Sequence, residues 1–260
     1  MFFIFKKKTI TVDCFTYSQS AYELYKIRKA SVYFPNSIRN LDSKIEWQDP
    51  ATNVTVPLAT IKHCTGINSL YKHGAIIPFW MDFVADPVRA LHGQSRIGTP
   101  DPWMLNTMGQ HLREQYPGIL ENYVQVKFSG VWALTAPKGL EFLWQGAFWN
   151  LNNSIENFLI PPAVTYFDTQ SQTNLNIFIK RNAEPFTIFA GTPMVHLIPL
   201  TDKKVEYKCH LVDKEEFGRK ETIPLDYPHI GEGLRNNKWR KDKEISDKLD
   251  KQERKCPFGY

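Results

Sequence analysis

The sequence lacks the short motifs by which many enzyme classes are recognised. It contains no Gly-x-Ser-x-Gly elbow, no Walker A loop and no Gly-x-Gly-x-x-Gly fingerprint. Its four cysteines are far apart and form no Cys-x-x-Cys pair, so neither a zinc site nor a dense disulfide framework is indicated. We therefore expect reduced thiols, and the sequence gives no support for hydrolase-elbow, P-loop or dinucleotide-binding chemistry.

Long apolar stretches are also missing. No segment approaches the ~20 apolar residues that a membrane-spanning helix needs. The apolar residues 1–5 come before Lys6, Lys7 and Lys8, which reverses the order of charge and apolar run in a secretory signal. The sequence therefore predicts a protein that is not secreted and that has no membrane partner.

Long blocks of charges of one sign are missing as well. The net charge is +5 and the pI is about 8.9, which is only mildly basic. From Asp213 onward about half of the residues are charged, but the two signs are mixed rather than grouped in blocks. This pattern predicts a solvated helix over residues 236–255, and no nucleic-acid partner is expected.

Aromatic residues, by contrast, are abundant. The chain has 17 Phe, 11 Tyr and 7 Trp, which favours strands because wide flat side chains fit a pleated surface. Between residues 123 and 200, apolar runs alternate with turn signals that contain Gly and Pro. The runs predict strands over residues 123–132, 140–144, 163–167, 175–179, 186–189 and 194–200. Short strands at this spacing are typical of a sandwich or a partly closed barrel.

Further elements flank this strand-rich centre. Ile10, Val12 and Cys14 alternate with polar residues, which predicts a first strand over residues 9–15. Other strands are expected over residues 75–84 and 205–212, and short helices over residues 17–29, 68–74 and 107–115. Residues 36–60 are expected to be irregular. The predicted fold is mostly β, with an antiparallel sandwich or jelly-roll-like core in residues 1–212 and a charged, partly helical extension over residues 213–260.

Several groups of residues resemble a known family when they are taken together. In chain order they are Ile10-Thr11-Val12-Asp13-Cys14-Phe15-Thr16, Lys29-Ala30-Ser31 with Phe34-Pro35, His63-Cys64 with Gly74 and Ile77-Pro78-Phe79-Trp80-Met81-Asp82, Trp132 to Gly139, and Ile188 to Val195 with Ile198-Pro199. They resemble a family of β-rich proteins encoded by tailed phages, especially marine T4-like myoviruses. The resemblance implies a phage source and a compact β fold, and it brings no catalytic residue. It also implies residence in the host cytoplasm or the virion, with other phage proteins or further copies of the chain as partners.

A metal site is the first chemistry to test on a β core. A non-haem iron centre needs two histidines and a carboxylate, commonly as His-x-Asp or His-x-Glu on a strand. None of the seven histidines has a carboxylate two residues later. The alternative that remains is iron held by two histidines and one carboxylate that converge from distant parts of the chain. The candidates are His63, His111, His196 and His210, with Asp82 or Glu114. Otherwise we expect His196 to be a core histidine bonded to backbone groups.

Trp80 and Asp82 are the candidate ligand-binding residues. On a strand they would share one face, and an aromatic ring beside a carboxylate could line a small-molecule or sugar pocket. The structural alternative is that Trp80 belongs to the core and that Asp82 caps a nearby turn or pairs with an arginine.

Two functions from different classes follow. The favoured one is a non-enzymatic phage protein without a cofactor, either a virion component or a binding module. The alternative is an iron-dependent, oxygenase-like auxiliary enzyme on a double-stranded β-helix core. The enzyme requires three ligand side chains close together in a pocket, whereas the binding module requires a large apolar or charged surface.

Overall fold

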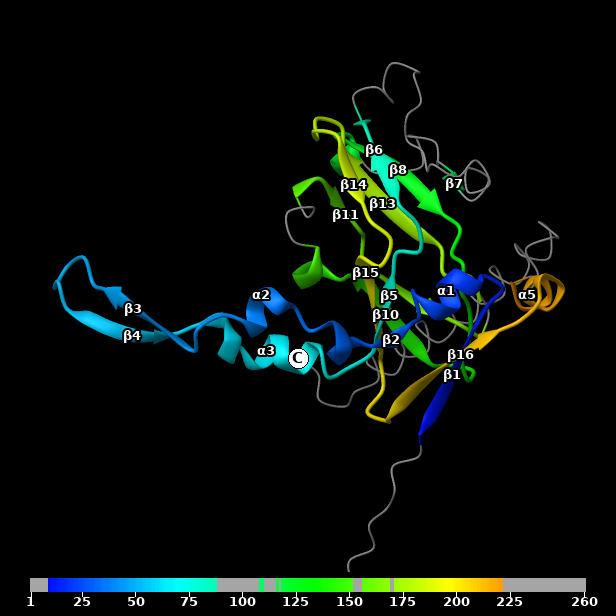
Figure 1. Cartoon of the computed structure of the whole chain (residues 1–260), viewed down its shortest axis with the longest axis horizontal. Helices are drawn as coiled ribbons and strands as arrows, with labels where there is room; N and C mark the ends of the chain where they lie inside the picture. Colours follow the sequence, from blue (N-terminus) through cyan, green and yellow to red (C-terminus); the bar gives the residue numbers. More distant parts are fainter. Residues whose placement is uncertain are drawn as a thin grey trace, which may run out of the picture.

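A β-rich body and one long projecting hairpin are visible in the computed structural model (Figure 1). The structure describes residues 9–87, 108–109, 116, 118–151, 156–168 and 171–221. Within these residues the strands form three larger sheets and two strand pairs. The predicted helix over residues 236–255, together with Trp239, Ile245 and Leu249, lies outside the described residues.

A three-stranded sheet has the order β16-β1-β9. Its strands are β1 (Ile10–Thr16), β9 (Ala133–Thr135) and β16 (Val205–Leu211). Val12 and Cys14 of β1 are fully buried, as the alternation in the sequence predicts. The pairing of β1 with β9 is antiparallel, whereas its pairing with β16 is parallel. The parallel pair is a departure from the expected antiparallel arrangement.

A five-stranded antiparallel sheet has the order β12-β10-β15-β5-β2. Its strands are β12 (Ala163–Tyr166), β10 (Glu141–Gly146), β15 (Pro193–Pro199), β5 (Ala75–Pro78) and β2 (Arg28–Lys29). All four residues of β5 are buried, so both faces of this strand are covered. This explains why β5 reads as a continuous apolar run rather than as an alternating one.

The remaining body strands form a four-stranded sheet and a strand pair. The four-stranded sheet has the order β11-β13-β8-β7, with β11 (Phe158–Leu159), β13 (Leu175–Lys180), β8 (Tyr123–Phe128) and β7 (Met108–Gly109). In the strand pair, β14 (Phe186–Ile188) lies beside β6 (Phe83–Ala85). Two predictions were wrong here. The strand expected over residues 75–84 is split between β5 and β6. The chain leaves the ladder at Phe79, whose N–H donates to Thr192 O and whose carbonyl accepts from Gly191 N in the turn before β15. A helix was expected over residues 107–115, but residues 108–109 form the strand β7. Residues 107 and 110–115 are outside the part of the chain that the structure describes.

Short helices connect and cover the sheets. The α-helices are α1 (Gln19–Glu23), α2 (Asn36–Arg39), α3 (Thr65–Leu70) and α5 (Lys214–Glu221), and the 3-10 helices are η1 (Ala30–Tyr33), η2 (Ile61–His63), η5 (Gly118–Leu120) and η6 (Phe148–Asn150). Helix α5 opens the charged extension and packs on the body through Phe217, whose ring meets Tyr17 at 4.9 Å. The charged extension therefore begins with a docked helix.

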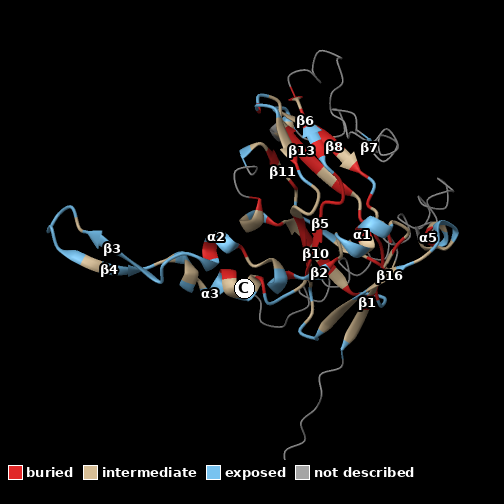
Figure 2. Cartoon of the chain, viewed as in Figure 1, coloured by how far each residue is buried: buried red, intermediate tan, exposed pale blue. Residues whose placement is uncertain are grey.

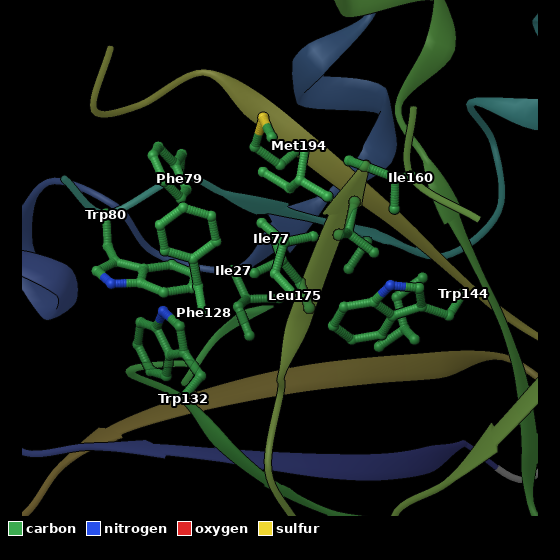
Figure 3. Packing of buried hydrophobic residues seen from close by; sticks show 14 of the residues in the cluster. Ile27, Ile77, Phe79, Trp80, Phe128, Trp132, Trp144, Ile160, Leu175 and Met194 are labelled. Carbon is green, nitrogen blue, oxygen red and sulfur yellow. The ribbon is translucent and has the colours of Figure 1, made fainter. Parts of the chain in front are cut away.

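One apolar core joins the sheets of the body (Figure 3). Phe128 of β8 packs edge-to-face on Phe83 of β6 and on Phe79, with ring centroids 4.9 and 5.2 Å apart. Full burial of such a side chain contributes about 1.5–3 kcal/mol. Each of the four body sheets supplies buried residues to the same cluster. The prediction of a mostly β fold with antiparallel sheets is confirmed.

Gly74 and Gly139 form a matched pair that tests how tightly β15 is packed. Both have a positive φ, +74° and +79°, which disfavours any residue with a Cβ. A Cβ on Gly74 would overlap the Leu197 carbonyl of β15, whereas one on Gly139 would meet nothing within 4 Å. We expect Gly139→Ala to lower the free energy of unfolding by about 1 kcal/mol and Gly74→Ala by about 3 kcal/mol or more, measured by denaturant titration. Equal losses in the two variants would contradict the packing described.

Candidate functional site

The hairpin β3–β4 is a separate two-stranded sheet that is not part of the β-rich body. β3 (Lys44–Gln48) and β4 (Thr55–Ala59) pair only with each other and extend away from the sheets (Figure 1). Residues 41–61 are called the arm below. Residues 36–60 were expected to be irregular, and this prediction was wrong for the strands β3 and β4. The missed signal was that Ile45 and Trp47, and likewise Val56 and Leu58, are two residues apart, on either side of Asp49-Pro50.

The turn at the tip of the arm is well ordered by its own side chains. Asp49 accepts hydrogen bonds from the backbone N–H of Ala51 at 2.9 Å and from the Thr52 hydroxyl at 2.6 Å. These bonds, the Thr52 hydroxyl first, lower the pKa of the Asp49 carboxyl. Asn53 adopts a φ of +57°, which asparagine tolerates well. The hairpin therefore closes through local chemistry and does not need the body to shape its tip.

One face of the hairpin is apolar and uncovered. Ile45 pairs with Leu58 and Trp47 pairs with Val56, so the four side chains share a face. Ile45 is 51% exposed, Trp47 43% and Leu58 41%. Figure 2 shows the hairpin as mostly exposed, in contrast to the buried strands of the body. An aromatic ring and branched side chains held outward in this way are typical of a binding surface.

The root of the arm is anchored to the body by a second, smaller core. Ile38 of α2 and Ile67 of α3 are buried with Tyr71 and with Ile76 of β5. The Tyr71 hydroxyl is hydrogen-bonded to Asn150 Oδ1 at 2.5 Å. Burial raises the pKa of the Tyr71 hydroxyl well above its ordinary value, so the phenol keeps its proton to donate. The arm is thus held firmly where it leaves the body.

The two arm strands are also fastened to each other where they meet the root. Lys62 Nζ donates to Leu41 O at 2.8 Å, and Thr60 N donates to Ser43 O at 3.2 Å. These bonds continue the β3–β4 ladder toward the root. The two sides of the arm are therefore held together at its base.

The arm is acidic and the rest of the chain is basic. Residues 41–61 contain Lys44 against Asp42, Glu46 and Asp49, a net charge of −2. Since the whole chain carries +5, the other residues together carry +7. The arm therefore has the opposite charge to the chain that bears it.

A basic surface lies on the body along β2 and β16. Arg28, Lys29, Lys204 and Lys208 are all exposed there. The pKa of the Glu206 carboxyl is lowered by Lys204, with which it pairs at 2.6 Å, and by the charges of Lys29 and Lys208. Lys29, Lys204 and Lys208 are therefore near Glu206, and Asp13 of β1 lies opposite Lys208 in the ladder.

Trp80 and Asp82 do not share a strand face. Both lie in the segment between β5 and β6. Trp80 is buried in the main core, whereas Asp82 is exposed and its Oδ1 accepts a hydrogen bond from Ala190 N at 2.8 Å. This is the arrangement stated above as the structural alternative, with Asp82 capping a turn. A ligand role for the two residues stays a prediction.

The candidate histidines lie on separate elements. His63 ends η2 at the root of the arm, His196 is in β15 and His210 is in β16, while His111 and Glu114 are outside the described residues. His210 Nε2 lies 2.8 Å from Asp13 Oδ1, and the ring stacks on Phe15. Among the residues that the structure describes, no group of three His, Cys, Asp or Glu is placed to hold a metal ion.

His196 is a core histidine, as expected. It is 1% exposed, and its Nε2 lies 2.8 Å from His73 O, so this nitrogen carries the proton. Its ring packs against Tyr71 at the root of the arm, with centroids 5.6 Å apart. Burial lowers the pKa of His196.

The buried imidazole of His196 predicts that the folded protein loses stability at low pH. Because the folded state takes up a proton at lower pH than the unfolded chain, the free energy of unfolding falls as the pH drops below about 6.5. We expect the melting temperature to fall less between pH 7.5 and 5.5 in His196→Gln, which keeps a donor for His73 O, than in the unsubstituted chain. His63→Gln, at an exposed histidine, should keep the full fall. The same fall in all three proteins would contradict this account.

Comparisons with known proteins give no relative for this chain. No protein-family model matches the sequence, and no match was found among curated proteins or among solved structures. Within the described residues, no helix is long and apolar enough to cross a membrane. The role of the arm is therefore inferred from its own contacts, exposure and charge.

Proposed function

We propose that this protein is a non-enzymatic assembly component of a tailed phage, and that it binds its partner through the arm. The observation that carries the proposal is the apolar face of Ile45, Trp47, Val56 and Leu58, all but Val56 exposed, on a hairpin that leaves the body. The resemblance to β-rich proteins of tailed phages supplies the phage setting, in the virion or the host cytoplasm.

An uncovered hairpin of this kind calls for a partner. Two-stranded hairpins are marginally stable in water unless a third strand or another surface covers their apolar face. The tip and the base of the arm are fixed by hydrogen bonds, yet the strands between them expose Trp47 and its neighbours to solvent. Covering this face would stabilise the hairpin and remove apolar surface from water at the same time.

Two arms facing each other do not provide enough surface. A face of two five-residue strands is about 17 Å long and about 10 Å wide, or about 170 Å². Two such faces bury about 340 Å², far less than the roughly 1,200 Å² of a stable specific interface. The arm therefore needs an acceptor that makes contact beyond this one face, at the tip of the arm and through its charges.

The acceptor that we propose is the body of a second copy. The arm has a net charge of −2, and the basic surface along β2 and β16 presents Arg28, Lys29, Lys204 and Lys208. Leu24, which follows the last residue of helix α1, is 65% exposed and adds apolar area, and α1 contacts β16. Trp47 would cover Leu24. Because Glu46 projects from the opposite face of the hairpin, its charge and that of Asp49 would attract these cations at longer range. Because donor and acceptor are different surfaces, two copies can exchange arms in a closed dimer, or the contact can repeat from copy to copy in a ring or a filament.

Removal of the indole at Trp47 tests the proposal. We expect the full-length protein to self-associate with rising concentration, and Trp47→Ser to weaken the association about 30-fold, the effect of losing a central aromatic anchor worth about 2 kcal/mol. Sedimentation velocity over a concentration series measures this. The matched control is Val164→Thr, at a residue of β12 that is 50% exposed, which should leave the association unchanged.

Charge exchange tests the acceptor. Glu46→Lys in the arm and Lys29→Glu on the body should each weaken association, and the double variant should recover part of it. Association that Trp47→Ser leaves intact would overturn the role of the arm. A chain that stays monomeric, yet enters virions only when Trp47 is present, would replace the second copy with another phage protein as the partner.

A further inference from the structure

Cys14 and Cys209 are far apart in sequence but adjacent in the fold. The parallel register of β1 and β16 places them directly opposite each other. Registered residues of neighbouring strands project to the same face of a sheet, and both cysteines border the main core. Cys14 is completely buried, whereas Cys209 is partly exposed. Both are free thiols.

The spacing of the two strands suits a covalent link. Neighbouring strands lie about 4.8 Å apart, within the roughly 4.4–6.8 Å between the Cα atoms of disulfide-bonded cysteines. The register places the two side chains side by side, with the Cys14 thiol bonded to Val12 O at 4.0 Å and the Cys209 thiol to Ile27 O at 3.5 Å. A disulfide here would therefore need only a small local adjustment of the strands.

The surroundings make the two thiols unequal. The neighbouring Cys14 thiol is the first cause that lowers the pKa of Cys209, and the charges of Lys26 and Arg28 act in the same direction. Burial, followed by the contact with Cys209, raises the pKa of Cys14 well above its ordinary value. A thiolate reacts with oxidants far faster than a thiol does. Cys209 combines a lowered pKa with partial exposure, whereas Cys14 is buried beside it as a protected second thiol.

We propose that Cys14 and Cys209 form a redox-active pair that reduces a hydroperoxide and becomes a disulfide between β1 and β16. The Cys209 thiolate attacks the outer peroxide oxygen, the O–O bond breaks, and the alkoxide or hydroxide that leaves takes up a proton, which produces a sulfenic acid on Cys209. The Cys14 thiol then attacks the Cys209 sulfur. The S–O bond breaks and water leaves with the Cys14 proton. Two thiols and one hydroperoxide thus give one disulfide, one alcohol or water, and one further water.

The disulfide would join the two ends of the described β core. β1 is its first strand and β16 its last, so the bond would close almost the whole body into one loop. A cross-link that closes a long loop restricts the unfolded chain strongly. We therefore expect oxidation to raise the melting temperature of the protein, and reduction by a dithiol to reverse the rise.

Peptide mapping of the native full-length protein tests the pair. The chain is treated with hydrogen peroxide, its remaining thiols are alkylated, and the digest is analysed by mass spectrometry. We expect a peptide that links Cys14 to Cys209 and disappears on reduction, whereas Cys64 should stay alkylated. In Cys14→Ser the sulfenic acid on Cys209 should persist and be trapped by dimedone. In Cys209→Ser the buried Cys14 should stay a reduced thiol, which is alkylated only after the protein is unfolded.

Cys64→Ser is the matched control and should give the same linked peptide as the unsubstituted chain. The proposal is overturned if Cys64 is oxidised before Cys209. It is equally overturned if Cys209 is oxidised in the folded protein without a link to Cys14. None of these outcomes depends on whether the arm binds a second copy, so this inference and the proposed function stand or fall separately.

Discussion

The edge-to-face contact of Phe128 with Phe79 and Phe83 is the interaction on which the body depends. Phe128 belongs to the four-stranded sheet, Phe83 to the β6–β14 pair, and Phe79 continues directly from β5 of the five-stranded sheet. Three sheets therefore meet at three rings, each fully buried. Such contacts stabilise by more than the area that they bury, because the positive edge of one ring faces the negative face of the next.

The arm, unlike the body, is not stabilised by an apolar core along its strands. Its turn is closed by Asp49 and its root by Tyr71 and Ile76, but the strands between them have no core of their own. The body is complete without the arm, since the arm strands pair with no other described strand. A segment with a fixed root, an ordered tip and an apolar face turned to solvent is suited to pack against something outside its own body. This contrast supports a role in assembly.

Local periodicity was enough to predict most of the body, because alternation and turn residues act over a few positions. Ile10, Val12 and Cys14 predicted β1 correctly, and His196 was expected to be a core residue bonded to backbone. The arm was missed because Ile45 and Trp47 alternate with charged residues over too short a distance to outweigh a polar neighbourhood. The closeness of Cys14 and Cys209 could not be predicted, since it depends on a parallel pairing between strands at opposite ends of the described core.

Hydrogen exchange across the assembly equilibrium tests the central claim, that the arm is a docking element, most directly. Amide exchange would be followed by mass spectrometry in dilute, monomeric protein and in concentrated, assembled protein. The account predicts that amides of β3 and β4 exchange rapidly in the monomer and become protected on assembly, while those of β5 and β15 are protected in both. Equal exchange of β3 and β4 in the two samples, with assembly verified in parallel, would contradict it.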